Sequence, residues 1–188
     1  MKLYIIRHGE SVNNLKGLWT GWSDVELTEK GIQDAKCAGE IIKNVRFDKI
    51  FSSDLSRAKK TGESALPGCK YQEDSKLREI CLGSLENKPI KDLTDEQREI
   101  INEKGYKPFG GETIEEFKDR ILEFRNELEN TNYENVAIFC HGGWLKYFLF
   151  LTLGTESLGN KVICNNCTVG IFEFKNDVWS LHSWINLV

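Results

Sequence analysis

Two short apolar runs in this chain each end at a histidine, and they constrain the fold more than any other feature. Leu3–Ile6 is followed by Arg7 and His8, and Val136–Cys140 is followed by His141 and two glycines. Apolar runs of this length are typical of parallel strands that helices bury on both faces. In such a sheet, ligands bind just beyond the carboxyl ends of the strands. The pattern therefore predicts an α/β fold with both histidines at one edge of the sheet.

The residue types at that edge suit the transfer of a phosphoryl group. A neutral imidazole is a good nucleophile near pH 7, and a hydrogen bond to its second nitrogen can orient it. The guanidinium of Arg7 offers a planar fork of donors that fits a phosphate, and Gly9 leaves room for backbone to approach a ligand. We therefore expect catalysis through a phosphohistidine at His8. For His8 and for His141 taken alone, the alternative is a buried core histidine.

Further along the chain, Arg57 and Glu79 are the next candidates for this chemistry. Arg57 is expected in the first turns of a helix just past the end of a strand, with Ser52, Ser53 and Asp54 as candidate caps. A solvated helix arginine is the alternative. Glu79 is a carboxylate with apolar neighbours, which suits a general acid. A helix pattern after Gly143 is expected to point its first N–H groups toward an anion.

The remaining periodicity alternates helices with strands. Threonine N-caps and apolar residues at three- and four-residue spacing mark the helices, and one of these, at 113–130, begins with a capping box. The expected elements are helices at about residues 28–44, 113–130 and 143–153 and strands at 47–51 and near 69–72, with a β-hairpin at a sheet edge over 168–174 and 179–184.

Two stretches between these elements are irregular. Residues 10–26 are loop-like, and there Asn14, Thr20 and the Gly21 amide could hydrogen-bond an anion. Trp19 and Trp22 in the same loop are at least as well explained by packing onto the domain. Residues 82–110 hold proline and glycine and one or two short helices around 92–104, which favours a variable cap over the site.

Composition limits the possible functions. The 188 residues suit a single domain, residues 1–188, with the excursion at about 82–110 as its cap. A net charge of −4 argues against a general nucleic-acid binder. We expect no secretory signal and no membrane span, because the most apolar run, 144–153, is short and contains a lysine. A cytoplasmic location with reduced thiols follows as a prediction.

The pair Cys164 and Cys167 has the spacing of half a zinc site or of a redox pair. The chain has no second Cys-x-x-Cys, and no helix pattern follows directly. Two small apolar side chains beside a strand are the simpler interpretation.

In combination, these motifs resemble the histidine phosphatase superfamily, also called the phosphoglycerate-mutase-like family. The resemblance covers most of the chain, and the order and spacing of its motifs are specific. It implies a three-layer αβα sandwich with a mainly parallel sheet and helices on both faces. The matching segments are Arg7-His8-Gly9-Glu10-Ser11 with Asn14, Thr20-Gly21-Trp22, Leu27 to Gly31, Ser52 to Ala58 with Thr61, Leu77 to Ile80 with Gly83 and Glu86, Gly110 to Thr113, and His141-Gly142-Gly143.

The resemblance also implies roles for these residues. It implies that His8 takes the phosphoryl group and that Glu79 protonates the leaving oxygen and then activates water. Arg7, Arg57 and His141 would hold the three equatorial oxygens. The implied secondary contacts to phosphate come from Asn14, Thr20, Gly21 and the Gly142 amide. The resemblance implies neither a metal nor another cofactor.

The chain departs from the family pattern in two places that bear on its reaction. Cys140 stands where the family often has serine. The loop around Trp22 looks like cofactor-dependent phosphoglycerate mutase, but the segment after Glu79 lacks the basic inserted lid of that branch. It looks instead like the phosphatase branch, including α-ribazole phosphatase and broad-specificity phosphatases. Only five basic residues follow in the cap, Lys88, Lys91, Arg98, Lys104 and Lys107.

The leading hypothesis is thus a metal-independent phosphomonoester hydrolase, a histidine acid-type phosphatase, acting on a small phosphorylated metabolite such as α-ribazole phosphate or a sugar phosphate. A shorter, less basic cap suits hydrolysis better than retention of a bisphosphorylated intermediate. The alternatives are a cofactor-dependent phosphoglycerate mutase and a non-catalytic protein that binds a phosphate ligand. The sequence does not select the substrate, and it leaves a homo-oligomer open.

Overall fold

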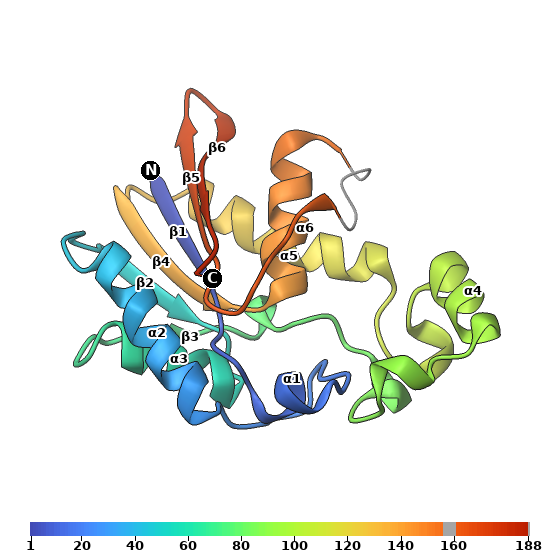
Figure 1. The fold of residues 1–188 in the computed structure, drawn as a ribbon. Coiled ribbons are helices and arrows are strands. Elements are labelled where there is room, and N and C mark those ends of the chain that lie inside the picture. The colour runs from blue at the N-terminus through green and yellow to red at the C-terminus, as the bar shows by residue number, and fades with distance from the viewer. Residues whose placement is uncertain (156–160, 188) are drawn as a thin grey trace.

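The computed structural model describes residues 1–155 and 161–187, which form a six-stranded sheet with helices on both faces (Figure 1). The strands are β1 (Lys2–Arg7), β2 (Lys49–Ser52), β3 (Gln72–Glu73), β4 (Asn135–Cys140), β5 (Val169–Lys175) and β6 (Val178–Ile185). The α-helices are α1 (Val12–Lys16), α2 (Glu29–Ile42), α3 (Ser56–Ala65), α4 (Asp95–Lys104), α5 (Ile114–Glu129) and α6 (Gly142–Leu153), and the 3-10 turns are η1 (Ser75–Leu77), η2 (Gly83–Leu85), η3 (Ile90–Asp92) and η4 (Lys107–Phe109).

The order of strands across the sheet is β3-β2-β4-β1-β5-β6, so the two strands that end at histidines are neighbours at its centre. β3, β2, β4 and β1 are parallel, whereas β5 and β6 form the antiparallel hairpin that was expected at an edge. Asn176 and Asp177 both have positive φ, which is the geometry of a two-residue type I′ turn. The sheet is therefore mainly parallel, as the apolar runs predicted.

The sheet lies between two layers of helices. Figure 1 shows α2 and α3 on one side of the strands and α5 and α6 on the other. Successive residues of β4 alternate between the two cores: Ile138 packs with α5 and α6, whereas Phe139 packs with α2 and α3. Both side chains are fully buried. Burial on both faces explains why the run at 136–140 shows no polar alternation.

Most of the predicted elements form close to the expected residues. Thr28 caps α2 through Gly31 N, and Thr113 opens α5 with a complete capping box. β2 begins at Lys49 rather than at residue 47. The prediction that residues 52–54 cap α3 is wrong. The acceptor at the start of this helix is a carboxylate far away in the sequence, because Asp24 Oδ1 accepts a hydrogen bond from Ser56 N at 2.8 Å.

The loop predicted at 10–26 contains a helix that was not predicted. α1 is only five residues long, and Ser11 starts it with a capping box that includes Asn14. Residues 82–110 carry η2, η3, α4 and η4, and Figure 1 shows α4 well to one side of the sheet. Within the described ranges, no helix is both long and apolar enough to cross a bilayer.

Candidate active site

The two histidines meet at one edge of the sheet, as the strand endings predicted. β1 and β4 pair in parallel with Arg7 opposite Cys140, so the next residue of each strand is a histidine at the same level. The ring centroids of His8 and His141 are 5.2 Å apart, with an angle of 62° between the ring planes. A parallel register between two central strands is thus what brings together two histidines that are far apart in the sequence.

The His8 ring is oriented by its own neighbour and kept uncharged by its surroundings. Nδ1 lies 2.7 Å from the Gly9 carbonyl oxygen. A carbonyl can only accept, so Nδ1 carries the proton and Nε2 keeps its lone pair. Burial, followed by the positive charges of Arg57 and Arg7, holds the His8 pKa well below its ordinary value. The ring is therefore neutral at neutral pH, which is the state that a nucleophile needs.

His141 is fully buried beside His8 and does not belong to the wall of the cavity described below. Its Nε2 lies 2.9 Å from the Ser53 hydroxyl. Its Nδ1 is buried and has no hydrogen-bond partner among the described residues. Burial, and then the charge of Arg57, holds the His141 pKa well below the usual range. One ring nitrogen thus remains unpaired next to the candidate nucleophile.

Arg57 is a buried residue of the site, and its reading as a solvated helix arginine is wrong. Its side chain is fully buried in the first turn of α3. Nη2 donates to the Gly21 carbonyl at 2.7 Å and Nη1 to the Ser23 carbonyl at 2.9 Å, whereas Nε is buried without a partner. Burial lowers the Arg57 pKa to about 10, so the guanidinium stays charged at neutral pH. Arg57 therefore fixes the 20–23 loop and also places a positive charge next to that loop.

Arg7 lies against the first turn of α6. Its Nη1 donates to the Cys164 carbonyl, and its Nε is buried without a partner in the described structure. A Cβ at Gly142 would come within 3.0 Å of Arg7 Nε. Glycine at 142 therefore lets the guanidinium approach the N-terminus of the helix, where unpaired amides favour an anion.

Glu79 also reaches the first turn of α6. Its Oε2 accepts from Gly143 N at 2.9 Å and its Oε1 from Ile80 N at 3.0 Å. A Cβ at Gly143 would lie 2.2 Å from Oε1. The second glycine after His141 thus makes space for this half-buried carboxylate, which the sequence alone could not foresee.

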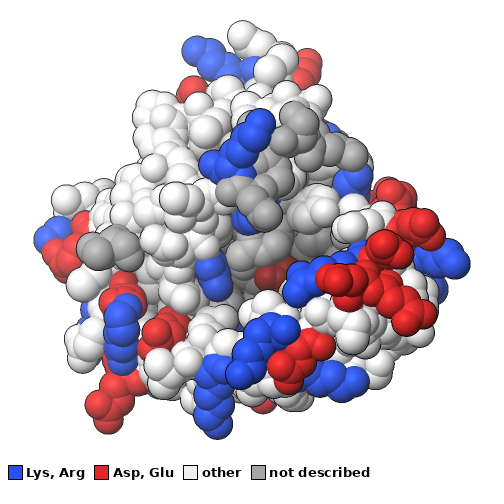
Figure 2. Space-filling view, turned by 45° about the vertical axis from the view of Figure 1, so that its right-hand side comes forward, with Lys and Arg blue, Asp and Glu red and all other residues white. Residues whose placement is uncertain are grey.

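These side chains surround a cavity of about 780 Å³ at the edge of the sheet. Figure 2 shows the molecule hollowed on this side, with basic and acidic side chains mixed around the hollow. Of the predicted site residues, all except His141 line the cavity, namely Arg7, His8, Asn14, Thr20, Gly21, Arg57, Glu79 and Gly142.

An outer layer of residues holds the segment from His8 to Asn14 in place, and most of it was not predicted. Asn166 Nδ2 donates to the carbonyls of His8 and Gly9 at 3.1 Å and to Asn14 Oδ1 at 3.0 Å. Thr61 Oγ1 accepts from Gly9 N at 3.0 Å. Asn166 sits between two cysteines in the sequence, and no pattern there signals this role.

Gly9 serves packing rather than the ligand, so its predicted role is wrong. A Cβ at this position would lie 2.3 Å from the Gly31 carbonyl oxygen in α2, and Gly9 is not part of the cavity wall. Glycine is needed here because two backbones approach each other closely.

The two tryptophans of the 10–26 loop differ in their positions. Trp22 packs over the Arg78 guanidinium at 4.8 Å and donates from Nε1 to the Glu79 carbonyl at 2.7 Å, which fits the packing interpretation. Glu86 accepts from Trp22 N at 2.8 Å and so fastens the loop to the segment after Glu79. Trp19, by contrast, lines the cavity.

The cysteines form no metal or redox centre in the part of the chain that the structure describes. All six are free thiols, and no three or more His, Cys, Asp or Glu side chains there are placed to share a metal ion. Burial raises the pKa of Cys167 to about 12. Cys140 is buried in the core, and burial likewise raises its pKa.

Comparison with known proteins agrees with this arrangement. The model of the histidine phosphatase superfamily (branch 1) matches residues 3–187. The chain belongs to this superfamily. Among its relatives in the superfamily, "Probable phosphoglycerate mutase GpmB" of Salmonella choleraesuis (strain SC-B67) is 31% identical over 98% of this chain and 90% of the relative.

Solved structures of two phosphatases share the whole fold. The α-ribazole phosphatase from Shigella flexneri superimposes with a TM-score of 0.87 at 26% identity, covering 98% of this chain and 96% of the other. Phosphoserine phosphatase from Entamoeba histolytica, in complex with 3-phosphoglyceric acid, gives a TM-score of 0.83 at 28% identity, with the same coverage of both chains. This chain is thus similar both to two phosphatases of known structure and to a relative named as a mutase.

Proposed function

We propose that this histidine phosphatase superfamily member is a phosphomonoester hydrolase that passes the phosphoryl group through His8. The observation that carries the proposal is the state of the His8 ring. Its Nδ1 is bonded to the Gly9 carbonyl, its pKa is depressed, and its Nε2 is left with a lone pair beside a cavity that two guanidiniums line. These are the requirements of a nucleophile that attacks a phosphate dianion.

In the proposed reaction, His8 Nε2 attacks phosphorus and the bond to the ester oxygen breaks. Glu79 gives its proton to the leaving oxygen, so the alcohol departs neutral. Arg7 and Arg57, with the Gly142 amide, hold the phosphoryl oxygens, and His141 Nδ1 supplies a further contact. The carboxylate of Glu79 then takes a proton from water, which attacks the phosphohistidine and releases inorganic phosphate and His8.

The second candidate is a phosphoglycerate mutase, because relatives at 31% identity carry that name. A mutase must bind a second phosphate and the carboxylate of its intermediate. None of the five basic residues of the cap is among the described residues that line the cavity. Besides Arg7 and Arg57, the described wall offers one cation, Lys146. This scarcity of positive charge favours hydrolysis.

The test is phosphate release in the presence of a chelator from phosphoserine, α-ribazole phosphate, sugar phosphates and 3-phosphoglycerate. The wild type should release phosphate from at least one ester, and His8→Ala should lose that activity. His182→Ala is the matched control, because this histidine is exposed on β6. Interconversion of 2- and 3-phosphoglycerate faster than phosphate release would instead establish the mutase. Tight binding of phosphate esters without any turnover would establish a binding protein.

A further inference from the structure

The cavity is much larger than a phosphate requires. It measures about 780 Å³, whereas a single water needs only about 10–15 Å³ by the same kind of measure. Pockets of this size bury most of the surface of a drug-sized molecule. Most of the space must therefore hold the alcohol part of the ester. The residues around that space indicate which kind of alcohol fits.

Five aromatic rings stand in the cavity wall beside aliphatic side chains of leucine and isoleucine. The rings come from the loop after α1, from the cap, and from the facing sides of α5 and α6, and they are Trp19, Tyr106, Phe117, Tyr147 and Phe150. The rings of Trp19 and Tyr106 are 6.4 Å apart with 66° between their planes. Burial raises the Tyr106 pKa to about 12, so its hydroxyl stays neutral. Flat apolar groups gain most from such a wall.

The charged residues of the cavity wall limit how many charged groups the alcohol can carry. Of the described lining residues, only Arg7, Arg57, Glu79 and Lys146 are charged. The first three are assigned above to the phosphoryl group and the leaving oxygen. Lys146 alone remains for the alcohol, so a body with several anionic groups would lack partners.

Trp19 adds a requirement for one acceptor. Its indole Nε1 is buried and has no hydrogen-bond partner in the described structure. A buried donor without an acceptor is unfavourable by about 1–3 kcal/mol, and an acceptor on the ligand would remove that cost.

Resting on the proposed function, we propose that the substrate is the phosphate monoester of an alcohol with a flat aromatic body. That body carries a hydrogen-bond acceptor for the Trp19 indole and at most one anionic group, which Lys146 receives. The ring walls of Trp19 and Tyr106 select it over small polar alcohols.

Esters with similar leaving oxygens but different bodies test this proposal. The kcat/KM for 2-(1-naphthyl)ethyl phosphate should exceed that for ethyl phosphate and for 3-phosphoglycerate by about tenfold or more. Tyr106→Ala should remove most of that preference. Trp179→Phe is a control in an aromatic cluster outside the cavity wall. Equal kcat/KM for all three esters would overturn the aromatic substrate and leave the hydrolase standing, since His8-dependent turnover is measured in the same assay.

The acceptor is tested with quinolinylethyl phosphates that carry the ring nitrogen at successive positions. At least one isomer should surpass the naphthyl ester with the wild type and lose that advantage with Trp19→Phe, which keeps a ring but removes the N–H. If no isomer gains, the assigned role of the Trp19 indole is wrong.

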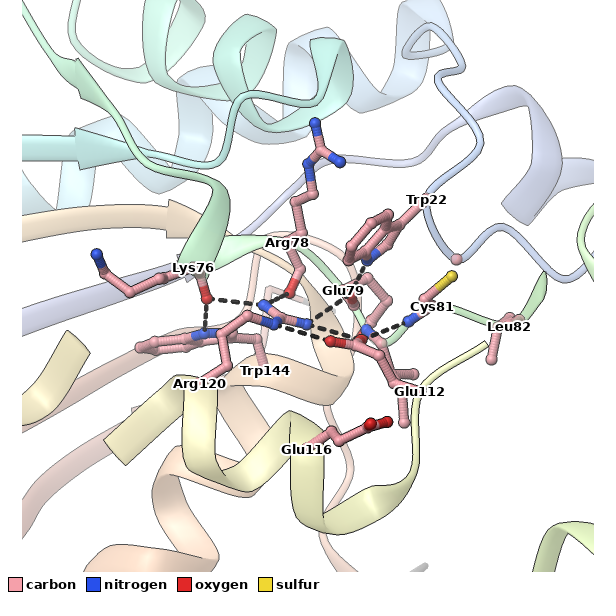
Figure 3. A network of polar contacts seen from close by, with 12 residues as sticks. Trp22, Lys76, Arg78, Glu79, Cys81, Leu82, Glu112, Glu116, Arg120 and Trp144 are labelled. Atoms are coloured by element: carbon pink, nitrogen blue, oxygen red, sulfur yellow. Dashed lines mark hydrogen bonds and ion pairs between the residues drawn. The ribbon is translucent and has the colours of Figure 1, made fainter. Parts of the chain in front are cut away.

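A separate observation concerns the backbone that carries Glu79. Figure 3 shows the Arg120 guanidinium of α5 pointing into the chain segment around Glu79. Its Nη1 donates to the carbonyls of Lys76 and Arg78, both at 2.8 Å, and its Nη2 to the carbonyl of Glu79 at 3.1 Å. One largely buried side chain therefore donates to three carbonyls, just before and at the candidate acid.

Glu112 binds the Arg120 guanidinium and also the backbone that follows Glu79. Its two carboxylate oxygens accept from Arg120 Nε at 3.0 Å and Nη2 at 2.9 Å, and Oε2 also accepts from Cys81 N at 2.7 Å. The Arg120 and Glu112 side chains are only 14% and 16% exposed, so solvent screens them little. The backbone before and after Glu79 is thus tied to a single ion pair.

We infer that Arg120 and Glu112 are positioning residues for Glu79, whose role as acid belongs to the proposed function. They touch no reacting atom, and they fix where the Glu79 carboxylate enters the cavity. A displacement of about 1 Å in such a group is enough to lower a rate by a factor near one hundred.

The test compares esters whose leaving groups need an acid with esters that do not. Arg120→Lys and the milder Glu112→Gln should lower kcat/KM for alkyl phosphates about tenfold more than for 4-nitrophenyl phosphate. Arg125→Lys is the matched control, because Arg125 lies on the same helix and pairs with Glu129 at 3.3 Å. Equal losses for both classes of ester, or no loss, would show a merely structural ion pair. Turnover of 4-nitrophenyl phosphate, and its loss in His8→Ala, tests the proposed function separately from the roles of Arg120 and Glu112.

Discussion

The imidazole of His8 lies edge-on to that of His141, with their ring centroids 5.2 Å apart. The ring of His8 is bonded through Nδ1 to a carbonyl, and the ring of His141 through Nε2 to a hydroxyl. Each ring therefore keeps its other nitrogen free of partners among the described residues. Two neutral rings in this relation suit the proposed roles, in which His8 is the nucleophile and His141 a further contact for an incoming phosphoryl group.

Acidification should destabilise the protein through these two histidines. Burial holds both pKa values well below the value of about 6.5 in an unfolded chain. Between pH 6.5 and 5, the unfolded state therefore binds protons that the folded state does not, and stability falls as pH falls. The slope is at most about 1.4 kcal/mol per pH unit for each histidine. Thermal melts from pH 7.5 to 5 measure it.

The matching variants for these melts are His141→Gln and His182→Gln. The first should flatten the dependence on pH, and the second should leave it as in the wild type, because His182 is exposed. A wild-type melting temperature that is constant over this range would show that the rings bind protons equally in the folded and unfolded states.

Arg57→Lys should impair binding of the phosphoryl group and should also loosen the 20–23 loop. Lysine keeps the charge but loses the planar fork that now reaches two carbonyls from one buried position. We expect kcat/KM to fall about a hundredfold and the melting temperature to drop. Arg98→Lys, on an exposed part of α4, is the control. Activity of Arg57→Lys close to that of the wild type would remove Arg57 from the site.

Gly143→Ala should disturb the Glu79 carboxylate without changing residue 79 itself. The added methyl would meet Glu79 Oε1 at 2.2 Å, so the carboxylate must move. We expect Gly143→Ala and Glu79→Gln to slow alkyl esters by a factor of about 10²–10⁴ and aryl esters with good leaving groups far less. Steady-state kinetics on both classes of ester decide the matter. If the two classes slow equally, Glu79 is not the acid.

Strong local patterns made the centre of the fold predictable. The run at 136–140 is apolar on both faces because both faces are covered, and its ending at His141 placed that ring at the correct edge. The helix at 113–130 was marked by its threonine cap and its apolar stripe. In both cases the deciding contacts involve residues near in sequence or a simple alternation of faces.

Contacts between residues far apart in the sequence could not be predicted by the same reasoning. The N-terminus of α3 takes its acceptor from Asp24, and Gly9 is required by the backbone of Gly31. Arg120 resembles any charged residue of an amphipathic helix until the structure places three carbonyls around it. Such contacts depend on how separate elements pack, which periodicity does not encode.

The most direct measurement is to quench a reaction with an isotopically labelled phosphomonoester at alkaline pH and to map the labelled residue by mass spectrometry and phosphorus NMR. We expect an acid-labile phosphoryl group on His8, attached at Nε2 because Nδ1 is bonded to the Gly9 carbonyl. His8→Ala should carry no label. Phosphate release by the wild type without any label on His8, or with label on another residue, would contradict the proposed mechanism.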